Sequence, residues 1–383
     1  MTISYLTKIE DIAELSANER SSLSKVTKRF AFRSNSYYQS LINWDDPEDP
    51  IRRLVVPHEE ELHEWGELDA SGEAGYTIMP GLEHKYPDTA LLLINNVCGA
   101  FCRFCFRKRL FLKGNQESVR NINKELRYIS AHKEITNVLL TGGDPLLMST
   151  PRLEPILENL TNIKHVRIVR IGSKMTAFNP YRIINDPTLL KLFAKIVESG
   201  TQLYLMNHFN HPRELTVDAK KALKMLASVG VMLVNQTPMI RGVNDDPAIL
   251  NNLFNQLSFL GIPPYYVFQC RPTKGNYIYA LPLEQAYRNF IEAWRCSSGL
   301  ARRARFVMSH QTGKIEVTGL TKGHIIFRYH RAPNPDNDGK IIICRRNPRG
   351  YWFDDFAKVE SLSDTMIEEV SNEAEEDLQT RLA

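Results

Sequence analysis

Three cysteines, Cys98, Cys102 and Cys105, stand close together in the order Cys-x3-Cys-x2-Cys, directly after the apolar run 90–94. Three thiolates on one loop can hold three irons of a cubane iron–sulfur cluster. The fourth iron then has no protein ligand and is open to a small chelating cofactor. The alternative is a structural zinc site, which needs a fourth Cys or His nearby, and residues 98–109 contain none. The spacing therefore predicts a [4Fe-4S] cluster.

Gly142-Gly143-Asp144 follows the second expected strand. Glycines let backbone groups approach a ligand closely, and a carboxylate beside them can bind an ammonium group. Taken alone, such a triplet is usually a turn, and Phe104, just before the third cysteine, could be an ordinary core residue. Together with the cysteine spacing, however, the triplet and Phe104 resemble the radical SAM superfamily, in which the open iron binds S-adenosylmethionine (SAM). The resemblance implies that Gly142, Gly143 and Asp144 contact the SAM amino group and that Phe104 lies against adenine.

Composition narrows the class of protein. The 383 residues are 24% charged and 43% hydrophobic, which suits one large domain or one domain with appendages. A net charge of +4 without a Lys/Arg run interleaved with aromatics argues against nucleic acid. No apolar stretch approaches a transmembrane span, and residues 1–20 lack the apolar core of a signal peptide. We therefore expect a cytoplasmic protein that does not bind membranes. Cys270, Cys296 and Cys344 are far apart and are expected to be ordinary thiols.

From residue 91 onward, short apolar runs alternate with helical patterns. The expected strands are 91–95, 136–141, 165–171, 202–207, 231–236 and 265–269, and the expected helices are 119–132, 153–160, 189–198, 217–229, 247–260 and 283–297. Continuous apolar strands between helices indicate a parallel sheet covered on both faces. Six units are fewer than the eight of a closed TIM barrel. The sequence therefore predicts an α/β fold, a partial (βα)6 barrel.

Four regions follow from this pattern. Residues 1–85 are expected to be an N-terminal helical cap, with helical patterns at 11–30 and 59–66, and residues 86–305 the barrel core. Residues 306–359 are expected to be a small β-rich extension, with strands at 314–317, 324–328 and 340–344. Residues 360–383 read as an acidic tail that is a solvated helix or disordered.

Polar residues recur where the expected strands end. The third strand end carries Arg170 and Ser173, the fourth His208, and the fifth Gln236. A lone histidine is more often structural than a ligand, but repetition at successive strand ends is typical of a lined cavity. A charge run such as Arg107-Lys108-Arg109 is usually a solvated face, but directly after the cysteine loop one of its guanidiniums could bind a substrate carboxylate as a fork.

The chain as a whole resembles the lysine 2,3-aminomutase family of radical SAM enzymes. The matching text spans nearly the whole length: Tyr37-Tyr38, Asp46-Pro47-x-Asp49-Pro50, Pro80-Gly81-Leu82-x-His84-x-Tyr86-Pro87-Asp88, the cysteine loop, Gly142-Gly143-Asp144, Arg170-Ile171-Gly172-Ser173, His208-Phe209-Asn210-His211-Pro212, Asn235-Gln236, Arg241-Gly242-Val243-Asn244-Asp245 and Pro264-Tyr265-Tyr266-x-x-Gln269-Cys270.

The resemblance implies a second cofactor, pyridoxal phosphate (PLP), held as a Schiff base by Lys314, which follows Gly313. Lys85 and Tyr86 would also contact PLP, and Arg107 would bind the substrate carboxylate. In such an isomerase, the cluster splits SAM to give a 5′-deoxyadenosyl radical. The radical takes a hydrogen from the substrate β-carbon, and the amino group, held as an imine to PLP, moves from the α- to the β-carbon.

Departures from the family pattern concern PLP and the substrate. A family arginine that helps to hold the PLP phosphate is Thr89 here, and a family aspartate that holds the distal ammonium of lysine is Arg271. A guanidinium facing an ammonium is repulsive by roughly 1–4 kcal/mol at a few ångströms. Lysine is therefore disfavoured, and an acidic amino acid such as glutamate would complement Arg271. The family's C-terminal zinc-binding cysteines are also absent. The oligomer that the family builds on this zinc is therefore not implied here, although a homo-oligomer is possible.

Two alternatives stay open at this point. The first is a PLP-independent radical SAM enzyme of the same family that performs another hydrogen abstraction, which Thr89 motivates. The second is a non-catalytic iron–sulfur or zinc-binding regulatory protein, which would not cleave SAM. Both the aminomutase and the PLP-independent radical SAM enzyme would need an electron donor such as flavodoxin or ferredoxin.

Overall fold

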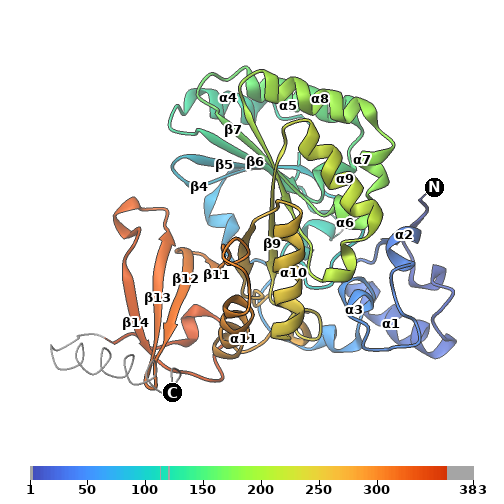
Figure 1. Cartoon of the computed structure of the whole chain (residues 1–383), viewed down its shortest axis with the longest axis vertical. Helices are drawn as coiled ribbons and strands as arrows, with labels where there is room; N and C mark the ends of the chain where they lie inside the picture. Colours follow the sequence, from blue (N-terminus) through green and yellow to red (C-terminus); the bar gives the residue numbers. More distant parts are fainter. Residues whose placement is uncertain (1–2, 113, 120, 360–383) are drawn as a thin grey trace.

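The computed structural model describes residues 3–112, 114–119 and 121–359, in which one twelve-stranded sheet forms the centre of the molecule (Figure 1). Six consecutive strands are parallel neighbours in chain order: β5 (Thr89–Asn95), β6 (Asn137–Gly142), β7 (Ile168–Ser173), β8 (Gln202–Asn207), β9 (Met232–Pro238) and β10 (Pro264–Phe268). The predicted partial (βα)6 barrel is confirmed. Its open form leaves the carboxyl ends of the six strands at one edge, where parallel barrels bind ligands.

Helices cover the outer face of these strands (Figure 1). They are α4 (Asn123–Ala131), α5 (Thr150–Thr161), the short α6 (Met175–Phe178) and α7 (Tyr181–Ile184), α8 (Pro187–Glu198), α9 (Val217–Ser228), α10 (Pro247–Phe259) and α11 (Leu283–Arg295). In α8, Leu189, Leu192, Phe193 and Ile196 are buried, the spacing of one helix face. The same apolar cluster includes Val169 and Ile171 of β7. Because strand side chains alternate, Arg170 then projects to the inner face.

The sheet continues beyond the six strands at both edges. Strand β11 (Arg305–His310) adds to β10 in parallel, and β12 (Gly313–Leu320), β13 (His324–Arg331) and β14 (Ile341–Arg345) follow as an antiparallel extension. At the other edge, β4 (Leu82–Tyr86) and β3 (Thr77–Met79) are antiparallel. The prediction missed β3, β4 and β11, and the last two cross the expected boundaries at 86 and 306. Strand β4 was missed because Glu83, His84 and Lys85 break the apolar pattern.

The N-terminal region is helical only in part. It contains α1 (Ala17–Arg29), α2 (Ser36–Gln39) and α3 (Pro50–Val55), but also a small antiparallel pair, β1 (Tyr5–Leu6) and β2 (Ser34–Asn35). The helix expected at 59–66 is a 3₁₀ turn, η2 (Glu59–Leu62). Figure 1 shows α1 and α3 on the side of the barrel opposite β12–β14.

Short 3₁₀ turns complete the described elements: η1 (Ile9–Asp11), η3 (Glu73–Tyr76), η4 (Lys108–Phe111), η5 (Pro145–Leu147), η6 (Pro212–Glu214), η7 (Tyr277–Tyr279), η8 (Pro335–Asn337) and η9 (Phe353–Asp355). The acidic tail expected at 360–383 lies outside the described residues. Among the described residues, no helix is both long and apolar enough to cross a membrane.

Candidate active site

The cysteine loop follows β5 and is fixed by hydrogen bonds from several directions. The Asn95 side chain donates to the carbonyls of Val97 and Asp144, each at 2.8 Å. On the other side, the buried Arg103 guanidinium is paired with Glu61, with an Nη2–Oε2 distance of 2.7 Å. The loop is thus held between the barrel and the N-terminal region, which fixes the three cysteines it carries.

The thiols of Cys98, Cys102 and Cys105 are unpaired and partly exposed. Burial raises the pKa of Cys102 to about 12, although the nearby Lys174 ammonium opposes this and the neighbouring Cys105 adds to it. The three thiols are therefore close enough to influence one another, and the charge of bound iron would stabilise them as thiolates. Among the described residues, no three His, Cys, Asp or Glu side chains converge to hold a single metal ion. A cubane differs because each thiolate binds a different iron, so this donor set fits a [4Fe-4S] cluster.

Gly142 and Gly143 allow a close approach of two chain segments. A Cβ on Gly143 would lie 2.5 Å from the backbone nitrogen and oxygen of Val97, and one on Gly142 would lie 2.4 Å from the Asn95 carbonyl oxygen. The Gly143 amide also donates to that carbonyl at 2.6 Å. The glycines were predicted to let backbone approach a ligand. In the structure they bring the end of β6 against the cysteine loop.

Asp144 was predicted to bind the SAM amino group, and in the structure its carboxylate accepts hydrogen bonds from within the chain. One carboxylate oxygen accepts from the Leu146 amide at 3.0 Å and the Ser173 hydroxyl at 2.7 Å, and the other accepts from the Lys174 amide at 2.8 Å. Burial raises the pKa of Asp144 to about 6. Asp144 and Ser173 thus tie the end of β6 to the end of β7, and the contact between Asp144 and SAM stays a prediction.

Phe104 and His208 meet beside the cysteine loop. Their rings lie edge to face with centroids 5.9 Å apart, and Phe104 is buried in an apolar cluster. Burial, with the neighbouring Lys174 charge, lowers the pKa of His208 to about 3, so the imidazole is neutral. The Lys174 amine donates to the His208 carbonyl at 2.5 Å and contacts Glu214 at 2.6 Å. Sequence reasoning missed Lys174, because a single lysine after Ser173 carries no distinctive spacing.

The other two residues predicted at strand ends are Arg170 and Gln236. Arg170 donates from Nε to the Asn137 side-chain oxygen at 2.8 Å. Gln236 lies on β9, one residue from Asn235, whose side chain holds the Phe209 backbone at 2.8 Å. Arg170 nevertheless lies close enough to Lys314 for its charge to lower the pKa of that amine.

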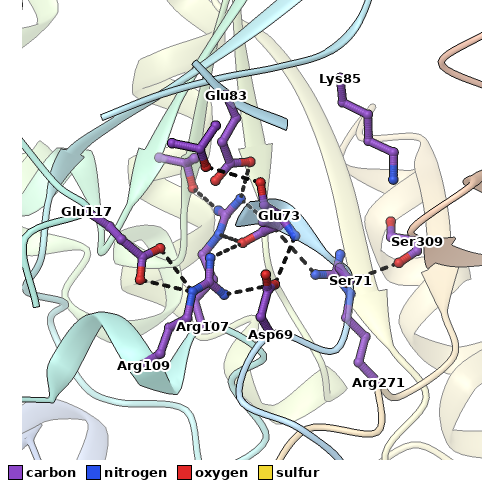
Figure 2. A network of polar contacts seen from close by, with 12 residues as sticks. Asp69, Ser71, Glu73, Glu83, Lys85, Arg107, Arg109, Glu117, Arg271 and Ser309 are labelled. Atoms are coloured by element: carbon purple, nitrogen blue, oxygen red, sulfur yellow. Dashed lines mark hydrogen bonds and ion pairs between the residues drawn. The ribbon is translucent and has the colours of Figure 1, made fainter. Parts of the chain in front are cut away.

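Three arginines surround one carboxylate, that of Glu73 (Figure 2). Arg107 binds it through Nε at 3.0 Å and Nη2 at 2.8 Å, Arg109 donates at 2.6 Å, and Arg271 lies at 3.9 Å. Burial raises the pKa of Glu73, but the arginines, Arg107 first, hold it at about 2. Arg107 was predicted to bind a substrate carboxylate, and in the structure its Nε and Nη2 bind Glu73 instead. Its third nitrogen, Nη1, donates to a neutral partner, the Thr141 hydroxyl, at 3.2 Å. Glu73 was missed because it begins a short 3₁₀ turn, η3, which has no regular apolar spacing.

Lys314 lies on β12 over two aromatic rings. Its amine is 4.5 Å from the centroid of Tyr266 and 4.8 Å from that of Phe268, and 3.5 Å from the Ser309 hydroxyl. Burial, followed by the charge of Arg271, lowers the pKa of Lys314 to about 7. No carboxylate within the described part of the chain lies at ion-pair distance from this amine. A lysine with a substantial neutral fraction near pH 7 is the nucleophile that a PLP aldehyde requires, so the site fits PLP.

Lys85 and Tyr86 lie beside the same site. The Lys85 amine donates to the His310 carbonyl at 2.5 Å and is 5.8 Å from the centroid of the Tyr86 ring. Burial and the Arg271 charge lower the pKa of Lys85 to about 8. The structure therefore brings together Lys314, Lys85, Tyr86 and Arg271, which are far apart in sequence.

Comparison with known proteins gives the class first. Residues 92–251 match the family model described as the radical SAM superfamily. The chain is 57% identical over 93% of its length, and 96% of the relative's, to an Aquifex aeolicus protein named "Putative L-lysine 2,3-aminomutase". It is 36% identical to the L-lysine 2,3-aminomutase of Fusobacterium nucleatum, covering 90% of this chain and 81% of that one. It is 35% identical to the glutamate 2,3-aminomutase of Clostridioides difficile, covering 70% and 63%.

A radical SAM methyltransferase from Sphaerobacter thermophilus is a similar solved structure, with a TM-score of 0.41, 19% identity, and coverage of 59% of this chain and 68% of that one.

The chain is thus a radical SAM enzyme. It belongs to the lysine 2,3-aminomutase family and is an isomerase that moves an amino group between neighbouring carbons of an amino acid. Its cofactors are a [4Fe-4S] cluster, SAM and PLP.

Proposed function

We propose that this aminomutase acts on an acidic amino acid and that Arg271 binds the second carboxylate. The observation that carries the proposal is the state of the Arg271 guanidinium. It is buried 3.5 Å from the Phe106 ring centroid, and its Nη1 has no hydrogen-bond partner among the described residues. Burial lowers the pKa of Arg271 to about 10. A buried cation with an unsatisfied donor favours an anionic ligand, and the name of the Clostridioides difficile relative is in keeping with this substrate class.

The remaining roles follow from the side chains around Arg271. We assign the substrate α-carboxylate to Arg107, whose Nη1 can exchange the neutral Thr141 hydroxyl for a charged acceptor. Lys314 is the amine that joins PLP, and Cys98, Cys102 and Cys105 are the iron ligands. When bound, the cluster and SAM supply the radical that removes hydrogen, and PLP supplies the conjugated ring that lets the amino group migrate.

The supply of electrons and the location belong to the same proposal. An external donor of the flavodoxin or ferredoxin kind reduces the cluster. The free thiols of the cysteine loop suit a reducing compartment, so we place the enzyme in the cytoplasm.

The experiment compares glutamate with lysine on the reconstituted enzyme, with β-amino products measured by mass spectrometry. We expect kcat/KM for glutamate to exceed that for lysine by about 100-fold, equivalent to ~2.7 kcal/mol. Arg271→Asp should reverse this preference. Arg303→Asp, at an exposed position, is the matched control and should leave it unchanged. Faster turnover of lysine by the unaltered enzyme would contradict the proposal.

A further inference from the structure

Lys314 has a second cation as its neighbour on the adjacent strand. In the antiparallel pair β12–β13, Lys314 lies directly opposite Arg331, and the register shifts between Lys314 and Ile315. Directly opposed residues of antiparallel strands have Cβ atoms about 4.5–5.5 Å apart, and a bulge changes the direction of the side chains beside it. The neighbouring His330 bonds the Tyr266 hydroxyl at 2.8 Å, the ring under the Lys314 amine. The end of β13 therefore faces the Lys314 site.

The Arg331 guanidinium extends from β13 to the beginning of β5. Its Cζ lies 4.4 Å from the centroid of the Tyr86 ring, and Nη2 is 3.2 Å from the Thr89 hydroxyl. Its anionic partner is Asp88, whose side chain is 55% exposed. An exposed carboxylate holds an arginine weakly, so a more highly charged anion can replace Asp88 in this fork.

Lys85 approaches the same Tyr86 ring from the other direction. Its amine bonds a backbone carbonyl, that of His310 on β11, rather than a carboxylate. Lys314 is thus flanked by Lys85 across β11 and by Arg331 on β13. Two cations placed around one tyrosine, beside a nucleophilic amine, form a site for an anion that also carries an electrophile. PLP, which carries an aldehyde and a phosphate ester on neighbouring carbons of its ring, combines these two groups.

We propose that Arg331, together with Lys85, binds the PLP phosphate while the PLP aldehyde reacts with Lys314. The Lys314 nitrogen bonds to the aldehyde carbon, and the aldehyde oxygen leaves as water. Arg331 thereby supplies, from β13, the guanidinium whose expected place on β5 is taken by Thr89. The inference rests on the proposed function for the identity of the reacting lysine.

The test uses the full-length protein and three probes: PLP, pyridoxal, which has the aldehyde without the phosphate, and pyridoxamine phosphate, which has the phosphate without the aldehyde. Borohydride reduction followed by peptide mass mapping measures the first two at Lys314, and calorimetry measures the third. Arg331→Ala should raise the half-saturating PLP concentration and the pyridoxamine phosphate Kd about 10- to 100-fold, the cost of a lost charged hydrogen bond. The pyridoxal response should not change.

Two variants control for indirect effects. Arg328→Ala removes another guanidinium of β13, one paired with Glu316 at 2.6 Å, and should leave all three probes unaffected. Thr89→Arg added to Arg331→Ala returns a guanidinium to the same place from β5. We expect it to recover most of the lost PLP affinity.

The outcomes separate the two proposals. Unchanged phosphate-probe affinity in Arg331→Ala, or equal losses for pyridoxal and PLP, would overturn the role of Arg331 while Lys314 stands. If no aldehyde labels Lys314 but pyridoxamine phosphate binding still depends on Arg331, the phosphate site stands and the lysine assignment fails.

Discussion

At the scale of single residues, the chemistry of the site depends on which side chains burial keeps neutral. The Lys314 amine is buried and lies near other cations, Arg271 first, so the protonated form is penalised twice, and its pKa falls to about 7. The ordinary lysine pKa is near 10.4. A neutral amine is thus available at the pH of the cell without a separate base.

This state gives a pH prediction. Labelling of Lys314 by pyridoxal and borohydride should rise as pH increases through about 7 and reach a plateau near pH 8, because only the unprotonated amine reacts. Labelling of exposed lysines in the same digest should continue to rise toward pH 10. Peptide mass mapping across pH 5–10 measures both. A Lys314 profile that follows the exposed lysines would show that burial does not set its reactivity.

Glu73 gives a stability prediction. Its carboxylate accepts from Arg107 and Arg109, and both arginines are largely buried. Glu73→Gln leaves these guanidiniums without their shared counter-charge, so we expect a loss of about 3–5 kcal/mol in the free energy of unfolding, measured by urea titration. The folded-state pKa of Glu73 is about 2, below its ordinary 4.5. Its contribution should therefore be complete above pH 4.5 and lost as the pH falls toward 2.

Glu83 is the matched control, because its pKa is raised in the folded protein whereas that of Glu73 is lowered. Burial and the nearby charge of Glu73 raise the pKa of Glu83 to about 7, so at pH 6 the folded protein holds this carboxyl mainly protonated. Glu83→Gln resembles that neutral form and should cost less than about 1 kcal/mol at pH 6. Because the folded pKa lies above 4.5, the contribution of Glu83 is present below pH 4.5 and is lost as the pH rises through 7. The variant should remove that decline, and an unchanged pH profile would argue against a raised pKa.

At the scale of elements, turns after strands hold the cysteine loop in place. The end of β6 touches the loop through Gly143, where a side chain would collide with the Val97 backbone. Gly143→Ala must therefore displace the loop, and we expect iron bound per chain after reconstitution to fall at least about threefold. Gly299→Ala, at a turn where a Cβ meets nothing within 4 Å and φ is not positive, is the control for added bulk and should retain its iron. Wild-type iron content in Gly143→Ala would show that the contact is dispensable.

Regular elements were predictable because their burial is periodic. The apolar spacing gave β8 its observed bounds, Gln202–Asn207, and placed α9 within one residue. Strand β4 was missed because its alternation is broken by polar residues whose partners come from elsewhere in the chain, such as the Tyr128 hydroxyl that meets His84. The cysteines and Lys314 carry local motifs, whereas Arg331 and Thr89 meet across 242 positions. Local sequence spacing cannot predict such a contact, so the proposed anion site around Tyr86 could be found only from the three-dimensional structure.

At the scale of the whole molecule, the C-terminal sheet is continuous with the barrel. Strand β11 joins β10 to β12, and one apolar cluster includes Phe290 of α11, Phe306 of β11 and Phe327 of β13. The Lys314 site therefore depends on a core shared by the barrel and the extension. The domain boundary predicted at 306 marks a change from βα units to consecutive strands in the sequence. Because the core continues across it, we expect the barrel and the extension to unfold together.

Phe327→Ala tests this continuity. Phe327 is fully buried, edge to face with Phe353 and Phe356, so its truncation should cost about 3–5 kcal/mol. Far-ultraviolet circular dichroism reports the barrel helices, and fluorescence in a variant retaining only Trp352 reports the extension. In urea, both signals should shift together to one lower midpoint. Ile341→Ala, on the edge strand β14 where the side chain is 56% exposed, should shift neither by more than about 1 kcal/mol. If the Trp352 signal moves alone, the extension is a separate cooperative unit, and the shared core does not couple the PLP lysine to the barrel.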